Sequence, residues 1–228
     1  MVDLKKERER KRREANKETI FHAAEAVIIR KGVASATMDE IAREAQFSKA
    51  TLYQYFRSKA ELVDEIVLHY YDDIRRLMEA IVAEAVPATE KLRRLVRASI
   101  EFHDEKENIS RVLMTDESFR GRVRAFLTRG QGDLSAQEKR FIRNMFVKLK
   151  TVLGVGEAVL GEGIRTHEFR EIDLETGASF LSAAVMGMFH DFGSPLRLLG
   201  PKERTDVIME FLLNGIAAAP GPGKGVSI

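Results

Sequence analysis

The side chains best suited to specific chemistry lie between residues 48 and 56. If Lys49–Phe56 is a helix, Leu52 and Phe56 point to one side as core residues. The opposite face then carries one small residue among hydrogen-bonding and basic side chains: Lys49, Ala50, Thr51, Tyr53, Gln54 and Tyr55. A small central residue lets a helix sit deep in a DNA major groove. Gln pairs with adenine, Lys reaches guanine and the Thr methyl contacts thymine, while Tyr hydroxyls suit phosphates. The alternative is an ordinary surface helix.

Two more candidates stand at the starts of predicted helices. Thr37 offers a hydroxyl group and free backbone amides. Lys59 adds an ammonium group to the free amides and positive dipole end of its helix. Both arrangements suit the binding of a phosphate.

Local signals predict the helices that position these residues. Thr37–Glu40 and Ser58–Glu61 are capping boxes, and Ser48 can cap the helix that follows it. With the hydrophobic periodicity, they predict helices at about Arg12–Lys31, Met38–Ala45 and Lys49–Phe56, and a longer one from the second box to about Ala85. Residues 37–56 therefore have helix-turn-helix spacing.

A strongly basic segment precedes these helices. The first 60 residues hold 14 Lys and Arg against 9 Asp and Glu, and the excess lies within the first 17. The basic residues there are Lys5, Lys6, Arg8, Arg10, Lys11, Arg12, Arg13 and Lys17. Such an arm indicates a polyanion partner or, alternatively, a solvated and frayed helix start.

Residues 37–59, TMDEIAREAQFSKATLYQYFRSK, resemble the helix-turn-helix signature of the TetR-type (TetR/AcrR) bacterial transcriptional regulators. The matching residues are Thr37, Ile41, Ala42, Ala45, Ser48, Thr51, Tyr53, Tyr55, Phe56 and Lys59. The departures are Gln46 and Phe47, where the family usually has Gly-Val, so Gln46 must take a turn conformation that Gly accepts more easily. The resemblance implies DNA contacts at Thr37, Ser48, Lys49, Ala50, Thr51, Tyr53, Gln54, Tyr55 and Lys59.

The rest of the chain is predicted to be all-α, with helices at about 88–103, 109–114, 116–129, 135–155, 174–192 and 201–217. The glycines between Gly154 and Gly163 indicate a helix end and loop. We divide the chain into a basic arm with a helix-turn-helix domain (1–65), a helical ligand-binding and dimerisation domain (66–219) and a disordered Gly/Pro tail (220–228). The last two predicted helices are apolar round most of their circumference, which predicts burial against a second copy. The alternative is that both helices complete one large monomeric core.

Several kinds of site are disfavoured. The chain has no cysteine, the glycine stretch lacks the Lys-Ser/Thr of a phosphate loop, and His167-Glu168 lacks the second His of a zinc motif, so no metal or cofactor is expected. Aromatic rings, a histidine and methionines at helical spacing are mostly core residues, and some are expected to line a pocket for an apolar or amphipathic molecule: Tyr70, Phe102, His103, Met114, Met186 and Phe189.

These observations favour a cytoplasmic, ligand-responsive DNA-binding repressor. The chain has no apolar run long enough to span a membrane, and it shows no convergent catalytic groups. We expect a homodimer to bind a palindromic operator in double-stranded DNA and a small-molecule effector to release it. The alternatives are a helical enzyme and a helical protein-interaction module that use the C-terminal cavity.

Overall fold

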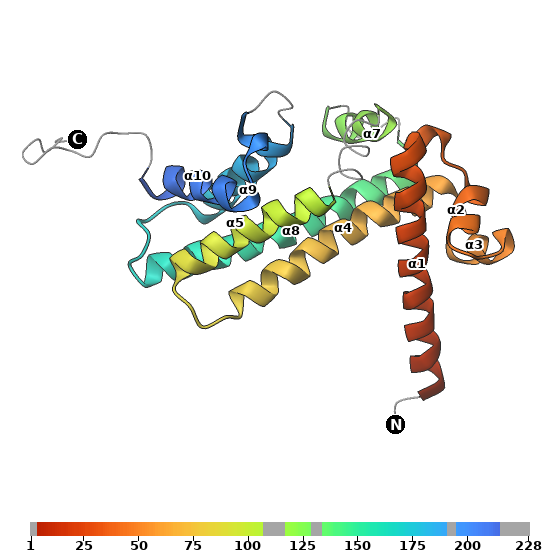
Figure 1. Cartoon of the computed structure of the whole chain (residues 1–228), viewed down its shortest axis with the longest axis horizontal. Coiled ribbons are helices and arrows are strands. Elements are labelled where there is room, and N and C mark those ends of the chain that lie inside the picture. Colours follow the sequence, from red (N-terminus) through yellow and green to blue (C-terminus); the bar gives the residue numbers. More distant parts are fainter. Residues whose placement is uncertain (1–3, 107–116, 129–133, 191–194, 215–228) are drawn as a thin grey trace, which may run out of the picture. The chain divides into compact units, whose positions relative to one another are not determined.

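The computed structural model describes residues 4–106, 117–128, 134–190 and 195–214, and every regular element in these ranges is a helix (Figure 1). This confirms the predicted all-α class. The elements are α1 (Leu4–Ser35), α2 (Met38–Glu44), α3 (Lys49–Tyr55), α4 (Lys59–Val82), α5 (Ala88–Glu105), α7 (Glu117–Thr128), α8 (Ala136–Arg165), α9 (Leu174–His190), a 3-10 turn η1 (Pro195–Leu198) and α10 (Pro201–Asn214).

The chain forms two compact units. The first comprises residues 1–76 and 105–152, and the second comprises residues 77–104 and 153–228. The helices α4 and α8 each begin in the first unit and end in the second. The functional domain boundaries drawn from the sequence stay a prediction, as does the state of the tail, which lies outside the described residues.

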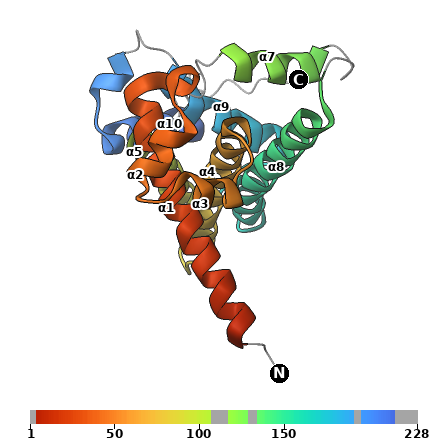
Figure 2. The ribbon, with the colours of Figure 1, turned by 90° about the vertical axis from the view of Figure 1, so that its right-hand side faces the viewer.

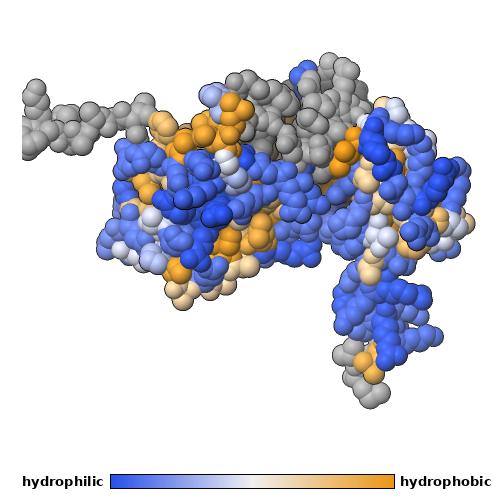
Figure 3. All heavy atoms as spheres, in the orientation of Figure 1, coloured by the Kyte–Doolittle hydropathy of each residue, from blue (hydrophilic) through white to orange (hydrophobic). Residues whose placement is uncertain are grey.

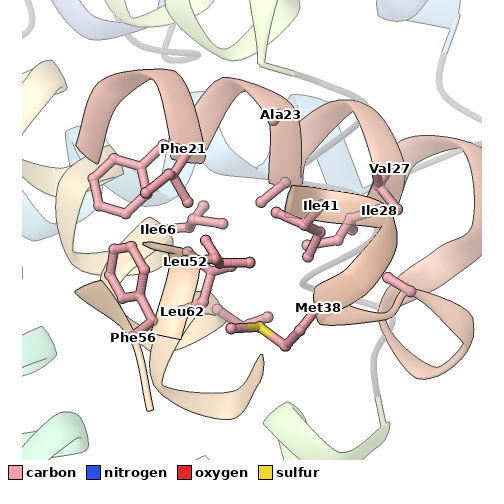
Figure 4. Close-up of a cluster of buried hydrophobic side chains, with 14 of the residues drawn as sticks. Phe21, Ala23, Val27, Ile28, Met38, Ile41, Leu52, Phe56, Leu62 and Ile66 are labelled. Carbon is pink, nitrogen blue, oxygen red and sulfur yellow. The ribbon is translucent and has the colours of Figure 1, made fainter. Parts of the chain in front are cut away.

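The core of the first unit holds the helix-turn-helix together. Side chains from α1, α2, α3 and the start of α4 converge on it, and Figure 4 shows Phe21, Ile41, Leu52 and Ile66 pointing toward one another. Ile41 and Leu52 are fully buried. These apolar positions recur at three and four residues along each helix, which places them on its inner face. The short helices α2 and α3 are therefore stabilised by packing against α1 and α4.

Two residues with positive φ shape the connections of this unit. Gly32 adopts φ +80° and ψ 161°, a conformation that only glycine enters readily, and the helical stretch continues past it to Ser35. Gln46, in the turn between α2 and α3, has φ +58°, as its place at the family's usual glycine predicts. Phe47 follows with its side chain half-buried against the core.

The second unit has its own core, built from α5, the later part of α8, α9 and α10. Lys91 of α5 is buried and pairs with Glu162 of α8 at 2.9 Å, so its buried charge is compensated. Glu168 accepts hydrogen bonds from the backbone N–H groups of Ala88 and Thr89 at 3.0 and 2.9 Å. These bonds satisfy two of the free donors at the start of α5.

The structure corrects the prediction for the glycine stretch. The helix α8 continues through these glycines to Arg165, instead of ending near Val155. A Cβ atom at Gly163 would lie 2.1 Å from the Phe169 ring, so the missing side chain lets the chain after α8 fold back onto the helix. Close packing, and not a loop, explains a glycine at this position.

Other helix boundaries also differ from the prediction. The first helix begins at Leu4, within the basic segment, and α4 ends at Val82. The helix expected at 109–114 lies outside the described residues. Of the helices described, none is long and apolar enough to cross a membrane.

Candidate nucleic-acid interface

The helix α3 is fixed at its start by the predicted cap. The Ser48 hydroxyl accepts a hydrogen bond from the Thr51 N–H at 3.0 Å, and the two hydroxyl oxygens are 2.8 Å apart. Ser48 and Thr51 therefore orient each other before any ligand is present. At the other side of the helix Leu52 is fully buried, which prevents α3 from rotating about its axis.

The opposite face of α3 is exposed, as the sequence predicts. Lys49, Ala50 and Gln54 are exposed, and Tyr53 is 43% exposed. Within the described ranges the side chains of Tyr53 and Gln54 make no hydrogen bond, so their donors and acceptors are available to a ligand. The Lys49 ammonium lies 2.7 Å from Asp39, and this hydrogen-bonded carboxylate raises the pKa of Lys49.

Thr37 forms the reciprocal capping box at the start of α2. Its hydroxyl accepts from the Glu40 N–H and donates to the Glu40 carboxylate, which also accepts from the Thr37 N–H. The hydrogen-bonded ion pair with Lys31 is the largest cause that lowers the pKa of Glu40, and the hydrogen bond from Thr37 is the next largest. Thr37 remains exposed, so its hydroxyl can still turn toward a phosphate.

The structure gives Lys59 a different role from the phosphate clamp expected for its ammonium. The Lys59 Nζ atom donates to the carbonyl oxygens of Val33, Ala34 and Ala36 at 2.7, 2.8 and 2.9 Å. All three of its donors are therefore satisfied by the chain that follows Gly32. The ammonium ties the end of α1 to the start of α4, and the DNA contact at Lys59 stays a prediction.

Tyr55 connects α3 to the first helix. Its hydroxyl accepts a hydrogen bond from the Asn16 amide at 2.8 Å, and the Arg13 guanidinium carbon lies 4.9 Å from the centre of the Tyr55 ring. Asn16 is missed by sequence reasoning because nothing in the motif marks it. The basic residues around it are the available signal. Through these two contacts the basic segment is held in register with α3.

The residues expected to line an effector pocket are distributed over the molecule. Tyr70 belongs to the first unit and packs against Tyr71, while Phe102, His103 and Met186 belong to the second. His103 is buried and Phe102 is half-buried beside it. Met114 and the side chain of Phe189 lie outside what the structure describes. Their assignment to one pocket stays a prediction.

A cavity of about 380 Å³ in the first unit has a different lining. It is bordered by Glu18, Phe21, His22, Glu25, His69, Asp73, Arg76 and Lys106. The His69 ring nitrogen lies 3.0 Å from Glu18 and 3.3 Å from Asp73, which links α1 to α4. Among the described residues no group of three or more His, Asp or Glu side chains is arranged to hold a metal ion.

Comparison with known proteins shows which family this helix-turn-helix matches. Residues 20–66 match the model of the family described as bacterial regulatory proteins, tetR family. The match assigns this segment, and with it the helix-turn-helix, to the tetR type. It is similar to the HTH-type transcriptional regulator YhgD of Bacillus subtilis, with 20% identity over 202 residues that cover 89% of this chain and 97% of the relative. It is also similar to the HTH-type transcriptional repressor SCO4008 of Streptomyces coelicolor, with 43% identity over 54 residues, which are 24% of this chain and 28% of the relative.

Solved structures of such regulators share the fold. FadR from Bacillus subtilis, solved in complex with stearoyl-CoA, matches with a TM-score of 0.66 and 18% sequence identity, covering 88% of this chain and 99% of that one. At this identity the likeness shows the fold. The chain therefore carries an N-terminal helix-turn-helix of the tetR type, and its relatives are HTH-type transcriptional regulators.

Proposed function

We propose that this protein is a TetR-family regulator that represses transcription by binding a near-palindromic operator as a homodimer in the cytoplasm, and that a small apolar or amphipathic molecule releases it. The observation that carries the DNA-binding part is the exposed face of α3. Ala50, Tyr53 and Gln54 lie there side by side on a helix whose other face is locked into the core. In such a face Gln54 suits a base edge and Tyr53 suits a phosphate.

The direct test is a selection of binding sites from randomised duplexes. The wild-type chain is expected to select one inverted repeat. Gln54→Ala is expected to lose preference at particular base pairs, by about 1–3 kcal/mol at each. Thr37→Ser, which keeps the capping hydroxyl, serves as the control and is expected to select the wild-type sequence. If the Gln54 variant recovers the wild-type motif, Gln54 does not read bases.

The homodimer is supported by apolar surface on the second unit. On α9, Phe180 is 64% exposed and lies in one row with Ala183 and Gly187, both exposed, because these positions are three and four residues apart. On α10, Phe211 is 58% exposed. The sequence pattern predicts that more of α10 faces a partner, but Ile208 and Met209 are buried within the subunit itself. The remaining exposed row with two small residues suits close approach of a second copy.

The effector class rests on composition and on one structural relative. The B. subtilis FadR structure contains stearoyl-CoA, an amphipathic molecule with a long acyl chain. We therefore take long-chain acyl-CoA as the first compound to test on this chain. An effector is expected to raise the melting temperature and to lower operator affinity together, because the two effects are thermodynamically linked. Compounds that stabilise the protein and leave operator affinity unchanged would argue against release by that ligand.

A further inference from the structure

The N-terminal part of α1 is a helix that projects beyond the rest of its unit. In Figures 1 and 2 it extends well past α2 and α3, and Figure 3 shows mainly hydrophilic residues over its visible surface. Residues 4–17 hold eight Lys and Arg side chains against three Glu. The segment that matches the tetR-family helix-turn-helix begins at residue 20, so this extension lies outside the matched segment. The helix-turn-helix by itself therefore does not account for the extension.

Two rows of side chains with different charge run along this extension. Arg8, Arg12 and Asn16 are four residues apart and form one row along the helix. A row of Glu7, Glu14 and Glu18 lies about 140° further round. On the acidic side, Arg10 pairs with Glu7 at 2.8 Å and with Glu14 at 2.9 Å, and Lys11 lies 3.8 Å from Glu7.

The basic row is more open. Arg8 and Arg12 are exposed, and the described part of the chain gives neither of them a hydrogen bond or an ion pair. Glu9 is the one carboxylate among residues 4–17 that lies near this row, and it leaves the row with a net positive charge. Two guanidinium groups are therefore available on one side of the helix.

The contacts of Tyr55 determine where this row points. Asn16, the last member of the row, donates to the Tyr55 hydroxyl, and Arg13 stacks over the Tyr55 ring. The guanidinium groups of Arg8 and Arg12 thus continue a line that starts at α3. From Asn16 to Arg8 the helix rises about 12 Å, the axial length of three to four base pairs. The acidic row is turned toward the other side, where Glu18 contacts His69.

We propose that α1 is itself a DNA-contacting element, in which Arg8 and Arg12 bind backbone phosphates just outside the half-site read by α3. This inference rests on the proposed DNA-binding function. The contacts are independent of sequence, because guanidinium groups on phosphates fix position without reading bases. The operator footprint of each subunit is then longer than α3 alone would require. The alternative partner for a basic helix is an anionic membrane surface, but the register of the row with α3 favours DNA.

The test compares two double variants of the full chain. Arg8→Ala/Arg12→Ala removes the open row. Arg10→Ala/Lys11→Ala removes the same charge from the acidic side and is the matched control. Affinity for the palindrome selected by the wild-type protein is measured against salt concentration. The slope of log affinity against log salt is expected to become shallower by about 0.9 for each phosphate that the first variant no longer neutralises. In the control the slope is expected to change by less than the value for a single phosphate.

A second measurement uses duplexes of two lengths. Adding about four base pairs outside each half-site is expected to raise the affinity of the wild type and the control, and not that of Arg8→Ala/Arg12→Ala. Equal slopes for that variant and the wild type, or equal losses of affinity in both variants, would overturn the proposal. If Arg8→Ala/Arg12→Ala loses binding to anionic phospholipid vesicles while its operator binding stays unchanged, the proposal is overturned in favour of a membrane surface. Circular dichroism verifies that both variants keep their helix. If the wild type selects no palindrome, the proposed function itself fails.

Discussion

Lys59 holds the chain after Gly32 against the start of α4. Its ammonium donates three hydrogen bonds to main-chain carbonyls, each between 2.7 and 2.9 Å. These carbonyls come from a segment that leaves the helical path at Gly32, where φ is +80°. Without the ammonium they would have to find water, so this single side chain stabilises the whole frame around α2 and α3.

We therefore expect Lys59→Met to destabilise the protein by about 1–2 kcal/mol, near the low end of the range for hydrogen bonds to charged groups because the site is only partly buried. For a chain of this size the melting temperature should fall by about 2–8 °C. Lys49→Met is the matched control, since it removes the same charge from a solvent-exposed ion pair, which contributes little to stability. Thermal unfolding without DNA measures both. Equal stabilities of the two variants would show that the three carbonyl bonds contribute little.

At the scale of elements, several helices are fixed by partners far away in the chain. The start of α5 is capped by Glu168, which lies beyond the end of α8. The bonds from the Thr89 and Ala88 N–H groups lower the pKa of the Glu168 carboxyl to about 2. The folded state thus favours the carboxylate form, and the cap is strongest while Glu168 is ionised.

This cap predicts a pH dependence. Because the folded-state pKa is lowered from 4.5, the stabilisation is fully present above about pH 4.5 and is lost as the pH falls toward 2. The difference in unfolding free energy between the wild type and Glu168→Gln is expected to shrink over this range. Denaturant unfolding at several pH values measures it. Glu171→Gln, which removes a nearby exposed carboxylate, is the control, and a Glu168→Gln difference that stays constant with pH would contradict the cap.

At the scale of the whole molecule, the proposed mechanism needs two copies. In the proposal, one helix-turn-helix reads one half-site, and the second half-site is bound tightly because the dimer tethers it. The exposed row on α9 is the surface that we assign to this contact. It includes Phe180, a large apolar side chain that is 64% exposed.

Phe180→Glu is expected to convert the dimer into a monomer, because the new carboxylates would be buried against each other. Affinity for a full palindrome should fall strongly, while affinity for an isolated half-site should stay the same. Val147→Glu introduces a carboxylate at an apolar position of the first unit that is 60% exposed, and it serves as the control. Sedimentation and operator binding test both variants. A Phe180 variant that remains dimeric with undiminished operator affinity would refute this interface.

Much of the first unit is determined by local sequence. The capping serine and threonine, Ser48 and Thr37, act where the motif predicts, because a cap depends on residues within one helical turn. The apolar spacing places Leu52 in the core and Gln54 at the surface for the same reason. The positive φ of Gln46 is also predictable, because it concerns the backbone conformation of a single residue in a turn.

The tertiary structure alone decided the roles that depend on residues distant in the chain. Lys59 binds carbonyls 23 to 26 residues earlier, and Asn16 binds Tyr55, 39 residues later. No local pattern encodes such pairs, because they form only when separate helices pack together. The glycines of α8 show the same limit. The local sequence predicts a helix end near Val155 and a loop through Gly163, whereas the helix continues and the Phe169 ring packs against Gly163 only in the folded chain. Propensity is local, and close packing is not.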